Sequence, residues 1–286
     1  MPAVNKRAKL SGGRLYTLYG EAGAGKTTFV ATMPRHYIIP TEDRHSHIQC
    51  RLEDPRPQDS GAVVRHLNWA ATDADTSTVI LDTVDSLDRM IDIEIRNHYG
   101  ANEYEASREL GGGFGTASNI KQNHWVSIMA AVTKCRTAGK NVILIGHSTR
   151  RTGVTDAGEE YERVEPSLHE ATFKMISGVS DAVFFMGIGA GGARFVQTSA
   201  TPHCFAKQSW NMPQRIQVTK ETTWGSAIGI PMRRFFAAPN EAVFDALCAA
   251  RIYTDSDIKA AIGITFDEIA SLDQAAAAKA LEVIKK

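Results

Sequence analysis

The sequence has no excess of charge of either sign, because 32 lysines and arginines stand against 32 aspartates and glutamates. A balanced chain creates no global field that would hold it on nucleic acid, so any contact with DNA must come from a local basic patch. Long apolar runs are missing as well. A run such as Ala182 to Gly189 is far shorter than a membrane-spanning helix, and we expect no association with a membrane.

Cysteine is scarce, and its spacing is uninformative about metals. The four cysteines are widely separated and form no C-x-x-C pair, which favours reduced thiols in a cytoplasmic protein over a disulfide framework. The first ten residues are polar and basic without an apolar segment, so we expect no signal peptide. His45, His47 and Cys50 lie close together, but no fourth ligand accompanies them, and we expect no metal site there.

The most informative stretch is a glycine-rich motif that matches G-x-x-x-x-G-K-[ST] at every fixed position. Glycines let backbone N–H groups surround a chain of phosphates, because no Cβ stands in the way. A β-forming run over 14–19 precedes the motif, and a short helical segment over 27–33 follows it. The sequence therefore predicts a nucleoside triphosphate site formed by Gly20, Glu21, Ala22, Gly23, Ala24, Gly25, Lys26, Thr27 and Thr28.

Within this motif two side chains have specific tasks. The lysine, Lys26, is expected to contact the β- and γ-phosphates, and the hydroxyl of Thr27 to bind Mg²⁺. The β-branched run over 76–82 ends in Asp82, which is the form of a Walker B strand. Asp82 would hold Mg²⁺ opposite Thr27, and we expect its strand to adjoin the strand that precedes the glycine motif.

Two further predicted strands deliver polar side chains to the sheet edge where ligands bind. Glu42 follows the strand over 36–40 and either orients and deprotonates the attacking water or is a solvated loop acid. His147 ends the strand over 141–147 and either senses the γ-phosphate or is a hydrogen-bonded strand end. A helix is predicted over 83–99, and its acids Asp85 and Asp88 are interpreted as first-turn residues favoured by the helix dipole.

The segment after His147, residues 148–163, is charged and interrupted by glycines. It is interpreted as a mobile basic loop beside the nucleotide site, which either contacts single-stranded DNA or is a solvated surface.

Three segments are expected in the chain: a flexible lead-in over 1–13, a nucleotide-binding core over 14–236 and a small helical module over 237–286. In the last segment, capping boxes that begin at Thr254, Thr265 and Ser271 predict three short helices. The module would either dock on a partner or neighbouring subunit, or pack as the end of the main domain.

The order of these motifs resembles that of the RecA-like P-loop ATPases, most of all the phage-encoded proteins of single-strand annealing and recombination. The stretches that carry the resemblance are Val79 to Leu87 and Val142 to Ser148, and it extends over roughly residues 14–213. The resemblance implies an α/β fold with a mostly parallel central sheet flanked by helices, followed by the small helical module. It also implies that Glu42 is the catalytic base and that His147 is the nucleotide sensor.

As cofactors the resemblance implies ATP and Mg²⁺. As partners it implies single-stranded DNA, held by the segment 148–163, further copies of the chain in a homo-oligomer, and a single-strand-binding or replication protein. It places the protein in the cytoplasm of a bacterial host.

One stretch departs from the family pattern. Relatives often carry Ala-Lys-Asn-Arg-aromatic-Gly-Leu-Pro, whose lysine and arginine reach the γ-phosphate of a neighbouring subunit. Here Lys207 is kept as a candidate catalytic residue, but Ser209 stands at the position of the arginine. Either Lys207 acts alone, Arg215 or Arg194 takes the place of the arginine, or hydrolysis is slow.

Two other functions remain open on the sequence. One is a small-molecule kinase that uses the same phosphate-binding motif, with Arg150 and Arg151 closing on the phosphates. The other is a nucleotide-gated binding module with negligible turnover, which the missing arginine favours. GTP is disfavoured as the nucleotide because no N-K-x-D base-reading motif occurs.

Overall fold

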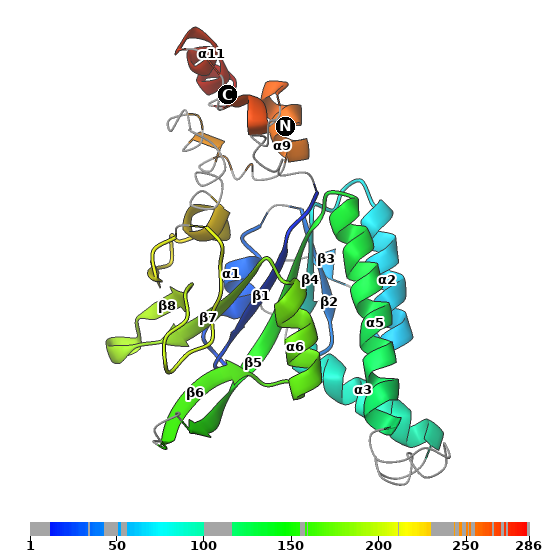
Figure 1. Cartoon of the computed structure of the whole chain (residues 1–286). Helices are drawn as coiled ribbons and strands as arrows, with labels where there is room; N and C mark the ends of the chain where they lie inside the picture. Colours follow the sequence, from blue (N-terminus) through cyan, green and yellow to red (C-terminus); the bar gives the residue numbers. More distant parts are fainter. Residues whose placement is uncertain are drawn as a thin grey trace, which may run out of the picture.

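The computed structural model describes residues 12–33, 35–42, 51–52, 56–99, 116–154, 158, 160–210 and 212–229, and in the C-terminal part 243, 246–247, 250, 252, 255–264, 266–269, 272 and 274–284. A nine-stranded sheet forms the centre of the molecule (Figure 1). Its order is β3-β2-β4-β5-β1-β7-β8-β9, and β6 pairs with β5 outside this path.

Six neighbouring strands of the sheet run parallel to one another. They are β3 (Arg51–Leu52), β2 (His36–Pro40), β4 (Thr78–Asp82), β5 (Asn141–Val154), β1 (Leu15–Gly20) and β7 (Ala182–Ile188). The remaining three pair antiparallel. They are β6 (Glu160–Pro166), β8 (Arg194–Gln197) and β9 (Arg215–Val218).

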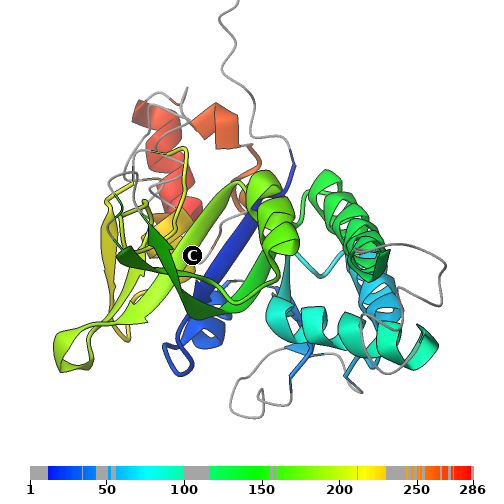
Figure 2. The same cartoon turned by 60° about the horizontal axis from the view of Figure 1, so that its bottom comes forward.

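Helices cover both faces of this sheet. In the described residues of the core they are α1 (Lys26–Val30), α2 (Ser60–Thr72), α3 (Val84–Tyr99), α5 (Thr116–Thr137) and α6 (Glu170–Val179). A 3₁₀ turn over Ala190–Gly192 and a π-helical turn over Gly225–Gly229 follow later in the chain. Figure 2 shows α2, α3 and α5 gathered beside the β2–β4–β5 half, away from β8. The predicted α/β fold with a mostly parallel sheet flanked by helices is confirmed.

Alternation along the buried strands produces two hydrophobic cores, because successive side chains point to opposite faces. Val79 and Leu81 of β4 pack in the core beneath α2, α3, α5 and α6. Ile80, between them, packs on the other face with α1. That second core is aromatic: the ring of Trp224 lies 5.3 Å from Tyr16 and 5.4 Å from Phe29, measured between centroids.

The C-terminal part contains the three short helices that the capping boxes predict: α9 (Asp255–Ile262), α10 (Phe266–Ile269) and α11 (Gln274–Ile284). They share an apolar cluster of their own with Val243 and Leu247. An ion pair between Arg35 and Asp257 links α9 to the core. The boundary at 236/237 stays a prediction, since residues 230–242 lie outside the described part.

The interpretation of 148–163 as a mobile loop is wrong for the described residues. Strand β5 continues past His147 to Val154 and pairs with β6, from Ser148 opposite Pro166 to Val154 opposite Glu160. Its arginines face acids: Arg150 lies 3.4 Å from Glu162, and Arg151 lies 3.6 Å from a carboxylate of β6. The segment is a projecting hairpin with cross-strand ion pairs.

Other differences are smaller. The short strands β3 and β9 were not expected, and the stretch His203 to Ala206 forms only isolated bridges instead of a strand. Cys135 and Cys204 are buried free thiols, whereas the group His45, His47 and Cys50 lies outside the described residues. Among the helices described, none is long and apolar enough to cross a bilayer.

Candidate nucleotide site

The glycine motif follows β1 at the carboxyl edge of the parallel sheet. Gly20 pairs with His147 on one side and with Met186 on the other. A Cβ on Gly20 would lie 1.9 Å from the carbonyl oxygen of Met186, so only glycine fits between the strands. Gly23 and Gly25 have φ angles of 78° and 91°, in the left-handed region that side chains disfavour. Helix α1 then extends from Lys26 to Val30, so the predicted helix after the motif is present but ends earlier than the expected 27–33.

Lys26 is held at the mouth of this loop. Its Nζ donates hydrogen bonds to the carbonyl oxygens of Gly20 and Glu21, each at 2.9 Å, which leaves one ammonium hydrogen for a further acceptor. The residue is only 6% exposed. Burial lowers the pKa of Lys26 below its usual value, while the carboxylates of Asp82 and Asp85 oppose that shift. A phosphate chain would stabilise the charged ammonium in the same way.

The Thr27 hydroxyl and the Asp82 carboxylate are in direct contact. Thr27 Oγ1 donates to Asp82 Oδ2 at 2.7 Å, across 55 positions in the sequence. The expectation that their strands adjoin is wrong, because β5 lies between β1 and β4. The contact forms nevertheless, since Thr27 lies beyond the end of β1 on α1 and reaches across the edge of β5. These two oxygens are hard ligands of the kind that Mg²⁺ prefers, and together they fit that ion.

Glu42 reaches the same edge from the end of β2. Its Oε1 accepts hydrogen bonds from Thr83 Oγ1 at 2.9 Å and from Ser86 Oγ at 2.6 Å. The backbone N–H of Thr41 donates to the carbonyl of Asp82 at 2.7 Å, which extends the pairing of β2 with β4 up to the acid. Hydrogen bonds to only one oxygen orient the carboxylate and leave Oε2 without a partner among the described residues.

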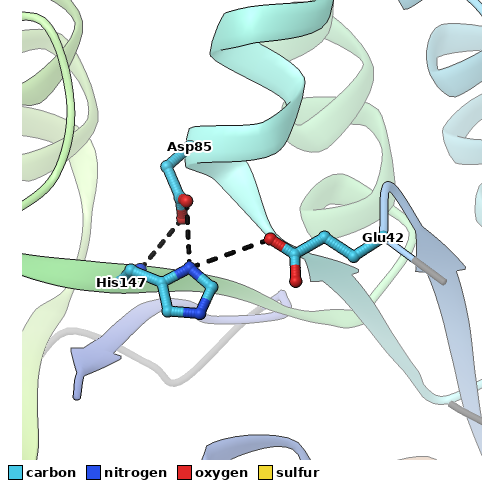
Figure 3. Close-up of side chains that lie close together, drawn as sticks. All are labelled: Glu42, Asp85 and His147. Carbon is cyan, nitrogen blue, oxygen red and sulfur yellow. Dashed lines mark hydrogen bonds and ion pairs between the residues drawn. The ribbon is translucent and has the colours of Figure 1, made fainter. Parts of the chain in front are cut away.

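His147 lies between Glu42 and the first turn of α3 (Figure 3). Its backbone N–H donates to Asp85 Oδ1 at 2.9 Å, and its Nδ1 lies 2.9 Å from Asp85 Oδ2 and 3.8 Å from Glu42 Oε1. Burial raises the pKa of Asp85, but the hydrogen bonds from His147 outweigh it and lower the pKa below its usual value. Sequence reasoning placed Asp85 in the first turn of α3, where it lies, but missed this contact.

Asp88 has a different task, one turn further along α3. Its carboxylate accepts from the indole N–H of Trp125 at 2.8 Å and pairs with Lys121 at 2.8 Å. These are contacts between helices α3 and α5, so Asp88 belongs to the packing of the core.

One cavity of about 330 Å³ brings most of the predicted site together. From the glycine motif it is lined by Ala22, Gly23, Gly25, Lys26, Thr27 and Thr28, and from the neighbouring strands by Glu42, Asp82, Thr83, His147 and Arg194. Of the other motif residues, Ala24 is buried, and Gly20 and Glu21 hold Lys26 through their carbonyls.

Arg194, at the start of β8, is one of the two residues considered in place of the missing arginine, and it lies at the cavity. A Cβ on Gly25 would lie 3.4 Å from its Nε, so the guanidinium stands against the phosphate-binding loop of its own chain. It forms no ion pair with any described acid. Arg215, the other alternative, instead stacks on Phe195, with 3.4 Å between its Cζ and the ring centroid.

Lys207 does not line the cavity. Its Nζ donates to the carbonyl oxygens of Ser177 and Gly178, at the end of α6. A contact between Lys207 and a nucleotide of another subunit stays a prediction. The two arginines considered for a kinase lid lie on the hairpin, where Arg151 also donates to the carbonyl of Leu168 at 3.0 Å.

Comparison with known proteins agrees with this geometry. A family model described as an AAA domain matches residues 13–210, more than half of the chain. No curated protein matches the chain. The matched range begins two residues before β1 and contains the glycine motif together with Glu42, Asp82 and His147. The chain therefore belongs to the AAA domain family, the P-loop ATPases of the AAA type.

Proposed function

We propose that the protein binds ATP with Mg²⁺ and hydrolyses it. The observation that carries the proposal is the 2.7 Å contact between Thr27 Oγ1 and Asp82 Oδ2, in a cavity that also holds Lys26 and Glu42. Membership of the AAA domain family supports nucleotide binding and ATPase activity.

The residues of the cavity divide the work between them. Backbone N–H groups of the glycine motif and the free hydrogen of Lys26 bind the phosphates. Thr27 and Asp82 would hold Mg²⁺, which neutralises charge on the β- and γ-phosphate oxygens when bound. Glu42, oriented through Oε1, accepts the proton of the attacking water at Oε2.

A second cavity supports a whole nucleotide as the ligand. It measures about 360 Å³ and shares Gly25, Thr28 and Arg194 with the phosphate cavity. Apolar side chains of Phe29 and Val218 contribute to its wall, as is usual where a flat base is bound. We place the ribose and base there, on the side of α1 that faces β9.

The test compares nucleotide binding with turnover. Lys26→Ala should abolish binding of a fluorescent ATP analogue, and Glu42→Gln should bind it as wild type does while turnover falls by about 100-fold or more. Glu160→Gln removes an exposed acid of the hairpin and serves as the control that changes neither. Turnover at the wild-type rate in Glu42→Gln would contradict the assignment. ADP release without any added acceptor would count against a kinase.

We further propose that this ATPase acts on single-stranded DNA, as an oligomer, in recombination or replication. The support is the resemblance to RecA-like proteins in residues 79–87 and 142–148. The hairpin is a poor candidate for the DNA contact, because residues 148–166 contain three arginines and five carboxylates. Phosphate binding requires an excess of positive charge.

The decisive measurement is ATPase activity with and without single-stranded DNA, alongside the particle mass. Stimulation by DNA together with a larger assembly is the expected result. If DNA changes neither quantity, the recombination proposal fails while the ATPase proposal stands.

A further inference from the structure

Asp85 makes hydrogen bonds to one residue, His147, and its Oδ2 also lies 3.6 Å from the guanidinium of Arg89. Its side chain is 4% exposed, and both of its oxygens contact His147. The backbone N–H of His147 donates to Oδ1, and the ring Nδ1 lies 2.9 Å from Oδ2 (Figure 3). A carboxylate that meets a backbone donor and a ring nitrogen of the same residue fixes both the position and the rotation of that ring.

The backbone around His147 is built to allow this approach. A Cβ on Gly146 would lie 3.3 Å from Val84 Cγ2 and 3.8 Å from Asp85 Oδ1. Because position 146 has no side chain, the first turn of α3 can lie directly against β5. The close contact is therefore a feature of the fold at this point and does not depend on one flexible side chain.

The contact also decides where the imidazole proton resides. An ionised carboxylate only accepts hydrogen bonds, so the Nδ1 that faces Asp85 must carry a hydrogen. In the neutral ring Nε2 is then an acceptor. Figure 3 shows this second nitrogen on the side of the ring opposite Asp85, and His147 lines the phosphate cavity.

We propose that Asp85 is a positioning residue that fixes the Nδ1–H form of His147, so that Nε2 accepts a hydrogen bond from the attacking water. The phosphate oxygens of a nucleotide are acceptors and cannot fill this role for a neutral ring. Glu42 is adjacent, with Oε1 3.8 Å from His147 Nδ1. The water is thereby oriented by His147 while it gives its proton to Glu42. This inference rests on the proposed ATPase function at one point only, namely that the water bound to Nε2 is the one that attacks ATP.

Asp85→Asn makes a sharp test because it preserves shape and reverses one hydrogen bond. The backbone N–H of His147 is always a donor, so it must be met by the oxygen of the new amide. The NH₂ group then faces Nδ1 and forces the proton onto Nε2. An equivalent carboxylate-to-amide change is known to impose the wrong histidine tautomer in the serine protease triad.

The first readout is the ¹⁵N NMR spectrum of His147, recorded with and without a non-hydrolysable ATP analogue. Wild type should show Nδ1–H with unprotonated Nε2, and Asp85→Asn should show the reverse. A wild-type ring protonated on Nε2 alone or on both nitrogens would overturn the proposal. The spectrum of the free protein tests Asp85 even if ATP does not bind, so failure of this proposal is distinguishable from failure of the proposed function.

The second readout is steady-state turnover. In Asp85→Asn we expect kcat to fall by about 100-fold, the lower end of what a positioned proton acceptor contributes, with KM within about threefold. In a background of His147→Ala the same substitution should cost nothing more. Asp88→Asn, a buried acid one turn along α3, controls for lost stability and should keep both kcat and the tautomer. Equal loss in Asp88→Asn, or full additivity with His147→Ala, would refute the role of Asp85.

Discussion

Arg194 provides the most direct test of the phosphate cavity, because a matched arginine lies nearby. We expect Arg194→Gln to weaken ATP binding and Arg215→Gln to leave it unchanged. Both residues lie on the antiparallel strands β8 and β9. Only Arg194 lines the cavity, beside Gly25, whereas the guanidinium of Arg215 covers the ring of Phe195.

The size of the effect follows from the charge of the lost contact. A hydrogen bond between charged groups contributes about 1.5–3 kcal/mol, and about 1.4 kcal/mol corresponds to a tenfold change in affinity. Arg194→Gln should therefore raise the Kd for ATP by about 10- to 100-fold. Since Arg194 is exposed and forms no ion pair with a described acid, its replacement should change the free energy of unfolding by less than about 0.5 kcal/mol.

Displacement of a fluorescent ATP analogue measures both variants on the same scale, and urea unfolding confirms that each is folded. Tripolyphosphate should lose affinity in Arg194→Gln to a similar extent, because the contact is with phosphate. The reasoning is refuted if Arg194→Gln binds ATP within about threefold of wild type. It is refuted equally if Arg215→Gln loses as much.

Three further outcomes are expected. Val218→Trp should fill the second cavity and weaken ATP binding in the displacement assay while tripolyphosphate binds as before; unchanged ATP affinity would exclude the base from that cavity. Gly20→Ala should lower the free energy of unfolding, measured by urea titration, by about 3 kcal/mol, because its Cβ would lie 1.9 Å from a backbone carbonyl. Gly178→Ala is the control: it lies on α6 with nothing within 4 Å of the new Cβ, and it should be neutral or stabilising in the same titration. The pKa of Asp85 is lowered in the folded protein. Its ionised carboxylate therefore stabilises the fold above the unfolded pKa of about 3.9, and this stabilisation is lost as the pH falls through the folded pKa. The free energy of unfolding of Asp85→Asn should therefore change less than that of wild type between about pH 6 and pH 3. An equal change in both proteins would mean that the contact with His147 contributes nothing.

The parallel strands and the glycine motif could be predicted because their signals are local. A continuous apolar run that ends in polar residues defines β2 at His36–Pro40, and the same pattern defines β4 up to Asp82. Glu42, Asp82 and His147 each end or follow such a run, so they must lie at the carboxyl edge of the sheet. The C-terminal helices α9, α10 and α11 likewise begin where capping boxes stand in the sequence.

Contacts that depend on strand order could not be predicted in the same way. Asp85 is an ordinary first-turn acid until β5 is placed between β1 and β4, which brings His147 against α3. Arg194 is distant from the glycine motif in sequence, and it reaches the cavity because β7, which forms a hairpin with β8, pairs with β1. The pairings of β1 with β5 and with β7 are long-range, and no local periodicity reports them.

The second half of β5 was missed for a related reason, and its presence changes how the site can communicate. Residues 148–154 are polar and read as a loop, yet they are held by β6 in a hairpin whose charges face one another. Ser148, directly after His147, already pairs with Pro166. Paired backbone therefore continues from the nucleotide cavity into the hairpin, so we expect a displacement of His147 to tilt the hairpin as a unit. Such a rigid-body movement differs from the ordering of a loop, which the interpretation of 148–163 as a mobile segment would have required.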